Sequence, residues 1–268
     1  MELLENPLLN KELNRINMNI LEVSFARIDS EWNMQHVISP FIRLYYAQSG
    51  EACIKYGGKT LRMTGGNIYL IPPNLDFSYW CDSSMCKLYA HINLLGYNNY
   101  DLLSGYNECI ILTDKQKEID MLVQQWHQGD LLSSVFIKTC LYQALLEALC
   151  QERISLGEIE EYSELVKRAI QIIKSNPHQS LSAQRLSELL FVSPSQLQKK
   201  FRQEMKVSLG QYVSEQVMFS AVNLLRSPDK SIKEISDTLG FCDQYHFSRR
   251  FCEYYGMPPS RYRKSLIF

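Results

Sequence analysis

The 268-residue sequence contains no Cys-x-x-Cys pair and no apolar run close to the ~18 residues that a membrane span needs. A chain of this length does not need disulfide staples, so its eight scattered cysteines predict reduced thiols in a cytoplasmic protein. The opening residues, MELLENPLLNKELN, lack a basic segment followed by an apolar core, and we therefore expect no secretion signal.

The two halves of the chain differ in charge, although the net charge of the whole is only −1. Residues 162–268 hold 16 Lys and Arg against 9 Asp and Glu, a net charge of +7. Residues 1–161 hold 12 basic and 20 acidic residues, a net charge of −8. This asymmetry favours a polyanion as partner of the C-terminal half, the alternative being a chance distribution over two solvated surfaces.

Short segments rich in β-branched and aromatic residues fill the region from Phe41 to Leu95. Turn signals separate them at Ser49-Gly50, Gly57-Gly58, Gly65-Gly66 and Pro72-Pro73-Asn74. Strands at such regular spacing predict a small β-barrel or sandwich. The expected strands are FIRLYYAQ, EACIKY, KTLRM, NIYLI, DFSYW and KLYAHINLL.

Helical periodicity replaces this pattern after Thr113, over DKQKEIDMLVQQWHQ and LLSSVFIKTCLYQALLEALCQERI. The second segment has more apolar surface than one side of a barrel obviously needs. It either packs on the barrel or pairs with its mate in a homodimer, with Leu141, Leu145 and Leu149 at that interface. ISLGEIE (154–160) is predicted to be a linker, and helices follow it. The broad apolar face comprises Val135, Phe136, Thr139, Cys140, Ala144, Leu145, Ala148 and Leu149.

The last hundred residues contain an internal repeat, in which LSELLFVSPSQLQKKFRQEMKVSLGQY aligns with ISDTLGFCDQYHFSRRFCEYYGMPPSRY. Phe201 aligns with Phe251 and Tyr212 with Tyr262, each 50 positions apart. Each copy has the layout of a helix-turn-helix: a short helix, a tight turn and a second helix. Ser193 with Pro194, and Asp243 in the second copy, are predicted to start the second helices.

Each of these second helices pairs an apolar stripe with an opposing polar stripe. Leu197 and Phe201, like Phe247 and Phe251, are four residues apart and face the core. The opposite sides carry long or planar donors and acceptors, which a recognition helix needs to reach base edges in the major groove. An ordinary amphipathic helix with a solvated face is the alternative. The predicted DNA-binding residues are Ser195, Gln196, Gln198, Lys199 and Arg202, followed by Gln244, Tyr245, His246, Ser248 and Arg249.

Residues 160–265 resemble the AraC family of bacterial transcription regulators. The resemblance rests on SIKEISDTLGFCDQYHFSRRFCEYYGMPPSRYR, with its Gly240-Phe241, Phe-x-x-x-Phe, Gly-x-x-Pro and Tyr262-Arg263 marks. It implies that GQYVSEQVMFSAVNLLR forms a helix joining the two units, so that both recognition helices enter successive major grooves. Within that pattern Lys199 and Arg249 are expected to reach bases or their phosphates, and Arg202 and Arg250 to serve phosphates or structure.

Four positions depart from the family pattern. Val217 stands where the joining helix usually has Arg, and Lys206 where the second copy has Gly256. Ser187 and Ser236 replace alanines of the helix-turn-helix units. None is a base-reading position.

The strand-rich half resembles the cupin-like effector domain of the family, especially at GGNIYLIPPNLDF. Metal-binding cupins supply a His-x-His cluster, whereas His36 and His91 stand alone here, so we expect no metal and no other cofactor. His91 is expected to be a satisfied structural histidine. Four aromatic residues are candidates for a pocket that binds a sugar or another small molecule, the alternative being plain core: Tyr45, Tyr79, Trp80 and Tyr89.

These observations predict a two-domain transcription regulator. Residues 1–157 form a mainly-β, cupin-like effector domain ending in dimerisation helices, and residues 158–268 form an all-α DNA-binding domain. Its two helix-turn-helix units cover about 163–212 and 213–265. The predicted partners are operator DNA, RNA polymerase, a second copy and a small effector. We expect no enzyme activity and no membrane partner.

Three alternatives stay open from the sequence. A cupin-type enzyme would need metal ligands or an acid–base pair, and neither is visible. An adapter would bind a protein with its N-terminal half instead of a small molecule. An alkyl-transfer repair protein would need a Cys cluster for zinc, which Cys53, Cys81 and Cys86 do not supply.

Overall fold

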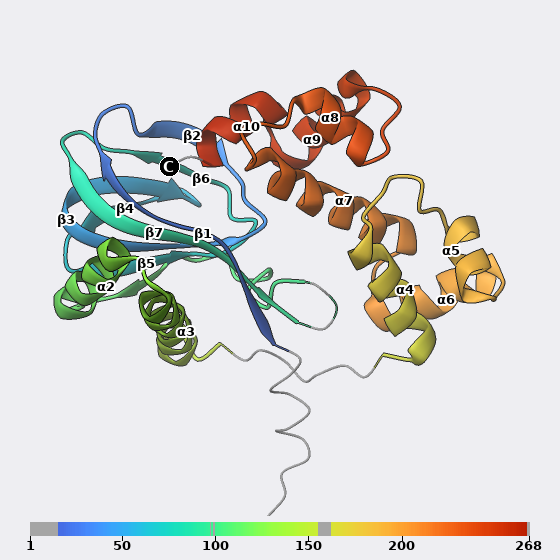
Figure 1. The fold of residues 1–268 in the computed structure, drawn as a ribbon, viewed down its shortest axis with the longest axis horizontal. Helices are drawn as coiled ribbons and strands as arrows, with labels where there is room; N and C mark the ends of the chain where they lie inside the picture. The colour runs from blue at the N-terminus through green and yellow to red at the C-terminus, as the bar shows by residue number, and fades with distance from the viewer. Residues whose placement is uncertain (1–15, 97, 99, 155–161, 267–268) are drawn as a thin grey trace, which may run out of the picture. The chain divides into compact units, whose positions relative to one another are not determined.

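The computed structural model describes residues 16–96, 98, 100–154 and 162–266. The chain splits into two compact units, Met1–Gly157 and Glu158–Phe268 (Figure 1). The expected linker at 154–160 lies, apart from Ile154, outside the described residues. Among the described residues, the first unit holds the strands and two helices, and the second unit holds helices and no strand.

The N-terminal unit is an antiparallel β domain in which two groups of strands share β3. One group runs in the order β1-β7-β3-β5-β8, and the other joins β2, β6 and β4 to β3. Rings from both groups meet between them, because Trp32, just before β2, contacts Tyr45 of β3 and stacks on Tyr79 of β6. The strands are β1 (Asn17–Ile28), β2 (Asn33–Val37), β3 (Ile42–Tyr56), β4 (Lys59–Thr64), β5 (Asn67–Ile71), β6 (Phe77–Trp80), β7 (Met85–Leu95) and β8 (Ile110–Leu112).

The predicted turn at Ser49-Gly50 is wrong, because β3 runs through these residues as one strand of 15 residues. The pairing of β3 with β7 shifts between Ala47 and Ser49, which marks an irregularity within the ladder. Gly50 has φ +82°, and a Cβ there would lie 2.1 Å from the Ser84 carbonyl oxygen. Glycine is therefore needed for close backbone approach rather than for a chain reversal. Strands β1, β2 and β8 were not predicted.

The strands β3 and β7 carry different chemistry on their two buried faces. Leu44, Leu88 and Ala90 belong to the main apolar core, whereas Arg43 and Lys87, at alternate positions, lie on the inner face between the strand groups. Both charged residues have no solvent exposure. The inner face is therefore polar although it is buried. Lysine and arginine are rarely buried completely.

Helices α2 (Gln116–Gln128) and α3 (Leu131–Gln151) cover the apolar face (Figure 1). Leu122 of α2 and Leu141 and Leu145 of α3 are buried in that core. By length and composition, α3 is the one helix among the described residues that would suffice to cross a membrane, with a mean hydropathy of 1.2. Of the helical stretch with this hydropathy, 28% is buried inside the unit, where its inward residues pack on the sheet.

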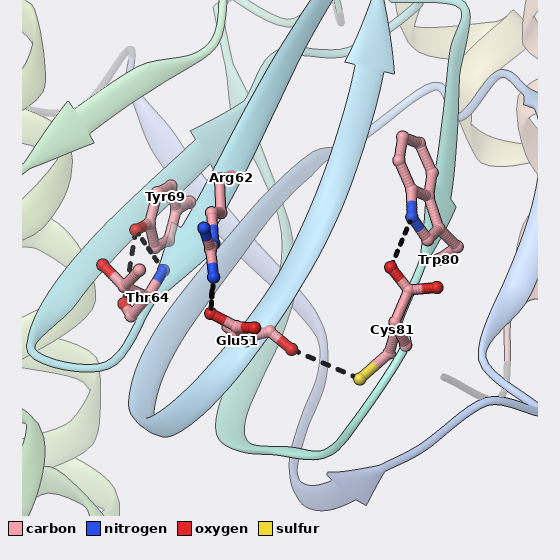
Figure 2. Close-up of polar contacts among 7 residues, drawn as sticks. Glu51, Arg62, Thr64, Tyr69, Trp80 and Cys81 are labelled. Carbon is pink, nitrogen blue, oxygen red and sulfur yellow. Dashed lines mark hydrogen bonds and ion pairs between the residues drawn. The ribbon is translucent and has the colours of Figure 1, made fainter.

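Side-chain contacts fasten the β3–β4 hairpin to its neighbours (Figure 2). The Tyr69 hydroxyl accepts from the Thr64 backbone N–H at 2.8 Å and donates to the Thr64 carbonyl at 3.2 Å. The Cys81 thiol donates to the Glu51 carbonyl at 3.3 Å, and Arg62 pairs with the Glu51 carboxylate. These contacts connect β4 to β5, and β3 to the end of β6.

The C-terminal unit consists of short helices around an apolar centre. Two pairs have the helix-turn-helix layout, α5 with α6 and α8 with α9, and α7 joins them. The helices are α4 (Glu164–Ser175), α5 (Ala183–Leu190), α6 (Pro194–Met205), α7 (Leu209–Leu225), α8 (Ile232–Thr238), α9 (Gln244–Tyr255) and α10 (Pro259–Leu266).

Candidate functional site

The first candidate recognition helix, α6, begins as the sequence predicts. The Ser193 hydroxyl accepts from the Gln196 N–H at 3.2 Å, and Pro194 occupies the first turn. Leu197 and Phe201 are fully buried. All five residues predicted to bind DNA from this helix are exposed: Ser195, Gln196, Gln198, Lys199 and Arg202.

The second candidate recognition helix, α9, repeats this arrangement. The Asp243 carboxylate accepts from the His246 N–H at 2.7 Å, and this hydrogen bond lowers the pKa of Asp243. Phe247 and Phe251 are fully buried. His246 packs edge-on against Phe241, with ring centroids 5.5 Å apart. Of the predicted residues, Gln244, Tyr245 and Arg249 are exposed, whereas His246 and Ser248 are half-buried.

Matching aromatic contacts hold the two helices in place. The Phe201 ring lies 5.4 Å from Tyr212 of α7, and the Phe251 ring lies 5.1 Å from Tyr262 of α10. These are the residue pairs that the 50-residue repeat aligns. Each recognition helix is therefore anchored by the same contact to the helix that follows it.

Ion pairs separate the basic residues of these helices into two groups. Lys200 pairs with Glu204 at 3.0 Å, and Arg250 with Glu253 at 2.9 Å. Arg249 is only 3.9 Å from Glu253, at the limit of an ion pair. Lys200 and Arg250 occupy aligned positions of the repeat, and each has an acidic partner on its own helix, four and three residues further on.

The turns of the two helix-turn-helix units share one backbone conformation but use different residues. Phe191 has φ +57° and its ring is 90% exposed, whereas the aligned Gly240 has φ +76°. A Cβ at Gly240 would lie 2.0 Å from Cε1 of His178, in the loop before α5. The Gln179 N–H also donates to the Leu239 carbonyl at 2.9 Å. The loop that leads into the first helix-turn-helix pair, α5 with α6, therefore packs on the turn of the second pair, α8 with α9.

The Tyr-Arg mark has a structural role. The Arg263 guanidinium donates to the Leu225 carbonyl at 3.1 Å and to the Lys230 carbonyl at 2.6 Å. It therefore satisfies carbonyls at the end of α7 and in the following turn. Val217, where the family usually has Arg, is fully buried in α7.

The four aromatic residues proposed for an effector pocket lie in two environments. Tyr45 and Tyr89 are buried on the inner face of the β domain. Tyr79 and Trp80 line a cavity of about 530 Å³ beside β2, β6 and the β3–β4 turn. Trp80 donates from Nε1 to the Asp82 carboxylate at 3.2 Å. Polar residues share the lining of this cavity: Asn33, Gln35, His36, Lys55, Asp76 and Ser78.

Three buried residues beside Tyr45 were not predicted: Trp32, Arg43 and Lys87. The Lys87 amine lies 3.7 Å from the centre of the Tyr45 ring and 3.9 Å from that of Trp32. Arg43 is 3.4 Å from the Tyr45 hydroxyl. The available signal was the alternation in KLYAHIN, where polar side chains at every second position indicate a polar strand face.

His91 is the satisfied structural histidine that the sequence predicts. It has no exposure, its Nε2 lies 3.2 Å from Arg43 and its Nδ1 lies 3.4 Å from Glu22. His36 contacts Asp76 at 3.2 Å on the surface. No group of three or more His, Cys, Asp or Glu that could hold a metal occurs among the described residues.

The chain thus has two helix pairs, α5 with α6 and α8 with α9. The second helices of the two pairs have matching caps, matching aromatic anchors and exposed polar faces, which define a helix-turn-helix DNA-binding protein. The profile of the family described as "Helix-turn-helix domain" matches residues 186–265. MarA of Escherichia coli is 32% identical over 91 residues, which is 72% of its length and 34% of this chain. The chain belongs to the AraC family of transcription regulators.

Relatives also match along almost the whole chain. The Msm operon regulatory protein of Streptococcus mutans is 25% identical over 95% of both chains. The lactose operon transcription activator of Staphylococcus xylosus is 23% identical over 82% of both chains. The crystal structure of apo ToxT from Vibrio cholerae matches 92% of this chain and 96% of its own, with a TM-score of 0.56 and 15% identity. The similarity to ToxT supports the order of an antiparallel β domain before a helical DNA-binding domain.

The unequal turns predict opposite effects of two substitutions on stability. Phe191→Gly should raise the free energy of unfolding of the C-terminal unit by roughly 0.5–1 kcal/mol, since it removes left-handed strain and loses little packing. Gly240→Ala should lower it by more than about 1 kcal/mol, because the added Cβ meets the His178 ring. Urea denaturation followed by the helical circular dichroism signal measures both. Equal midpoints for the two variants would contradict this account of the turns.

Proposed function

We propose that this chain is an effector-responsive transcription activator that reads its operator with α6 and α9. The observation that carries the proposal is the pair of exposed polar faces, on aligned helices of one compact unit with a net charge of +7 over residues 162–268. Each helix can enter a major groove, and successive grooves on one side of the duplex lie about 34 Å apart. An activator also implies RNA polymerase as a partner.

The basic residues divide into base-reading and backbone-binding groups. Lys199 and Arg249 occupy aligned exposed positions, opposite the buried phenylalanines, and are proposed to reach bases. Arg202 and Arg250 are proposed to bind phosphates or to stabilise the helices, which the Arg250–Glu253 ion pair supports. The polar residues that complete the proposed reading surface are Ser195, Gln196, Gln198, Gln244, Tyr245, His246 and Ser248.

Affinity of the full-length protein for its operator should fall steeply with salt. Several Lys and Arg contacts displace counterions from the duplex, so affinity should drop roughly a hundredfold or more between about 50 and 200 mM salt. The operator can be selected from random duplexes, and binding measured by fluorescence anisotropy against a scrambled duplex. Equal affinity for both duplexes at every salt concentration would refute sequence-specific reading.

Substitution of neighbouring arginines separates specificity from general affinity. Arg249→Ala should cost about 1–3 kcal/mol at one base position of the operator, because a bidentate contact to guanine is lost. Arg250→Ala is the matched control and should weaken binding to all duplexes by a similar small factor. Affinities for operators substituted at each position measure both effects. Uniform weakening by Arg249→Ala would reduce Arg249 to a phosphate contact.

The proposed effector site is the β domain. The cavity beside β2 and β6 combines the aromatic faces of Tyr56, Tyr79 and Trp80 with hydrogen-bonding side chains. Ligand sites commonly pair apolar and aromatic walls with a few polar groups. The names of two relatives refer to the Msm operon and to the lactose operon, and the second supports a sugar among the candidate ligands.

An exposed apolar seam on α3 supports a homodimer. Leu132, Val135, Thr139, Tyr142 and Leu146 follow one another at spacings of three and four, which is the pattern of a coiled-coil interface. Leu132 is 73% exposed and Leu146 is 62% exposed. Most of the seam lies away from the buried residues of α3, whereas the Tyr142 hydroxyl at its edge accepts from the Met18 N–H at 3.3 Å. A second copy could cover it with the same seam, as two-fold symmetry requires.

The residues predicted from the sequence for this interface, Leu141, Leu145 and Leu149, do not fit it. Leu141 and Leu145 are 0% and 2% exposed, and Leu149 is half-buried, because all three pack toward the sheet. An α-helix covering a sheet must turn its most regular apolar stripe inward, so the outward residues had to be identified from the structure. Substitutions at Leu141 or Leu145 would damage the core instead of the interface.

Charge on the seam should separate the proposed dimer. Leu146→Glu should place two like charges in a dry interface and raise the dimer dissociation constant at least about tenfold. Ser134→Glu, on an exposed position away from the seam, is the matched control and should leave it unchanged. Sedimentation velocity of the full-length proteins measures both. A native protein that is monomeric at micromolar concentration, with and without operator, would exclude the dimer.

A further inference from the structure

Two buried hydrogen-bond donors on the inner face of the β domain have no acceptor. Lys87 Nζ and Trp32 Nε1 are both inaccessible to solvent, and neither has a hydrogen-bond partner within the described residues. The two groups are neighbours, since Nζ lies 3.9 Å from the centre of the Trp32 ring. Buried donors are nearly always paired, and each exception needs a physical reason.

The surrounding charges do not supply the missing acceptor. Arg43, also fully buried, is beyond the Tyr45 ring, with its guanidinium 3.4 Å from the Tyr45 hydroxyl. The carboxylate that contacts this cluster, Glu22, accepts from the Tyr89 hydroxyl at 2.7 Å and lies 3.4 Å from His91. Neither group is a hydrogen-bond partner of Lys87 Nζ.

An unpaired acceptor elsewhere on β7 lies too far away to help. Asn93 Oδ1 is buried without a partner, six residues along the strand from Lys87. At about 3.3 Å per residue this separation is roughly 20 Å. The Lys87 amine cannot reach it.

The aromatic rings compensate Lys87 only in part. The amine lies between the faces of Trp32 and Tyr45, at 3.9 and 3.7 Å from the ring centres, and cation–π attraction favours its charged form. Burial and the Arg43 charge oppose this and lower the pKa of Lys87 well below its usual value. A ring face accepts no conventional hydrogen bond, so the N–H donors of the Lys87 ammonium group remain without an acceptor.

The cavity beside β2 and β6 adjoins this cluster. Phe77 and Tyr79 line the cavity. The same two rings contact the buried groups, because Tyr79 stacks on Trp32 at 4.2 Å and Phe77 lies 5.6 Å from the Arg43 guanidinium. The Phe77 and Tyr79 rings thus link the cavity to the buried cluster that contains the unpaired donors.

We propose that the inner face of the β domain binds an anionic group of a small ligand, a carboxylate or a phosphate, which accepts hydrogen bonds from Lys87 Nζ and Trp32 Nε1. Arg43 adds a second positive charge behind Tyr45. The proposal rests on the effector-responsive function proposed above and specifies its ligand chemistry: the effector carries negative charge, unlike a neutral sugar.

The first test needs no ligand. Lys87→Met keeps the length of the side chain and its contact with the rings but removes the unpaired amine. Binding groups are often kept at a cost in stability. If Lys87 serves to bind an anion, Lys87→Met should therefore unfold at a midpoint temperature several degrees above that of the native protein. A lower midpoint would mean that the ammonium is a structural cation, and would overturn the proposal. Lys117→Met, at an exposed position of α2 outside the cavity lining, is the control and should leave the midpoint unchanged.

The second test isolates ligand charge. Glucose 6-phosphate and gluconate are compared with glucose as phosphate, carboxylate and neutral probes of similar size, by calorimetric titration of the full-length protein. At least one anion should bind the native protein and bind Lys87→Met at least about tenfold more weakly, as expected for a lost charge-assisted hydrogen bond. Lys117→Met should bind it as the native protein does. Preference for the phosphate or the carboxylate identifies the kind of anion.

Binding of glucose alone, or of neither anion, would overturn the inference, as would anion binding that Lys87→Met leaves intact. Operator binding by Lys87→Met is measured in parallel. Because Lys87 belongs to the β domain, operator affinity should be retained in the absence of the probes. If the native protein binds its operator specifically but binds neither anion, only the anion site is refuted. If the native protein does not bind its operator specifically, the proposed DNA-reading function is refuted.

Discussion

The contact between a phenylalanine on each recognition helix and a tyrosine on the following helix is the constraint on which the DNA-binding unit depends. Phe201 against Tyr212 and Phe251 against Tyr262 bury both rings of each pair completely. Losing such a buried ring costs about 3–5 kcal/mol, a large part of the stability of a domain. With this side fixed, the residues at the intervening positions must face outward. The polar reading surface thus follows from the placement of the core.

The repeat made this part of the molecule predictable from sequence. Aromatic residues spaced by four, Ser193 and Asp243 as caps, and aligned basic positions are local signals that act within a few turns of helix. The same local reasoning could not foresee that His178 would occupy the space beside Gly240, since that contact joins segments about 60 residues apart. Nor could it foresee that Ser187 would donate to the Gln184 carbonyl while the aligned Ser236 hydroxyl is buried without a partner.

The β domain was predicted as a class but not in its strand order. Strand β1 pairs with β7, whose residues lie about 70 positions later, and such pairing leaves little trace in either segment alone. Ser49-Gly50 has the composition of a turn but lies at an irregularity within β3. Glycine is needed there because the chain approaches the Ser84 backbone closely. Lys87 was treated as an ordinary strand residue, since lysine is almost never fully buried and its neighbour Trp32 is 55 positions away.

The alternation along β3 and β7 also connects the proposed ligand face to the proposed dimer helix. Lys87 and Tyr89 point to the inner face, whereas Leu88 and Ala90, between and beside them, pack in the core that α2 and α3 cover. Tyr46 of β3 donates from its hydroxyl to the Cys140 carbonyl of α3 at 3.4 Å. Close-packed interiors transmit strain. A displacement of β3 or β7 would therefore also displace α3, which packs on the other face of the same strands. A ligand on the inner face shifts the position of α3 only to the extent that it binds two arrangements of these strands unequally. At the proposed anion site the unpaired Lys87 amine would offer such a difference, because a small movement of β7 changes the distance between Nζ and the anion.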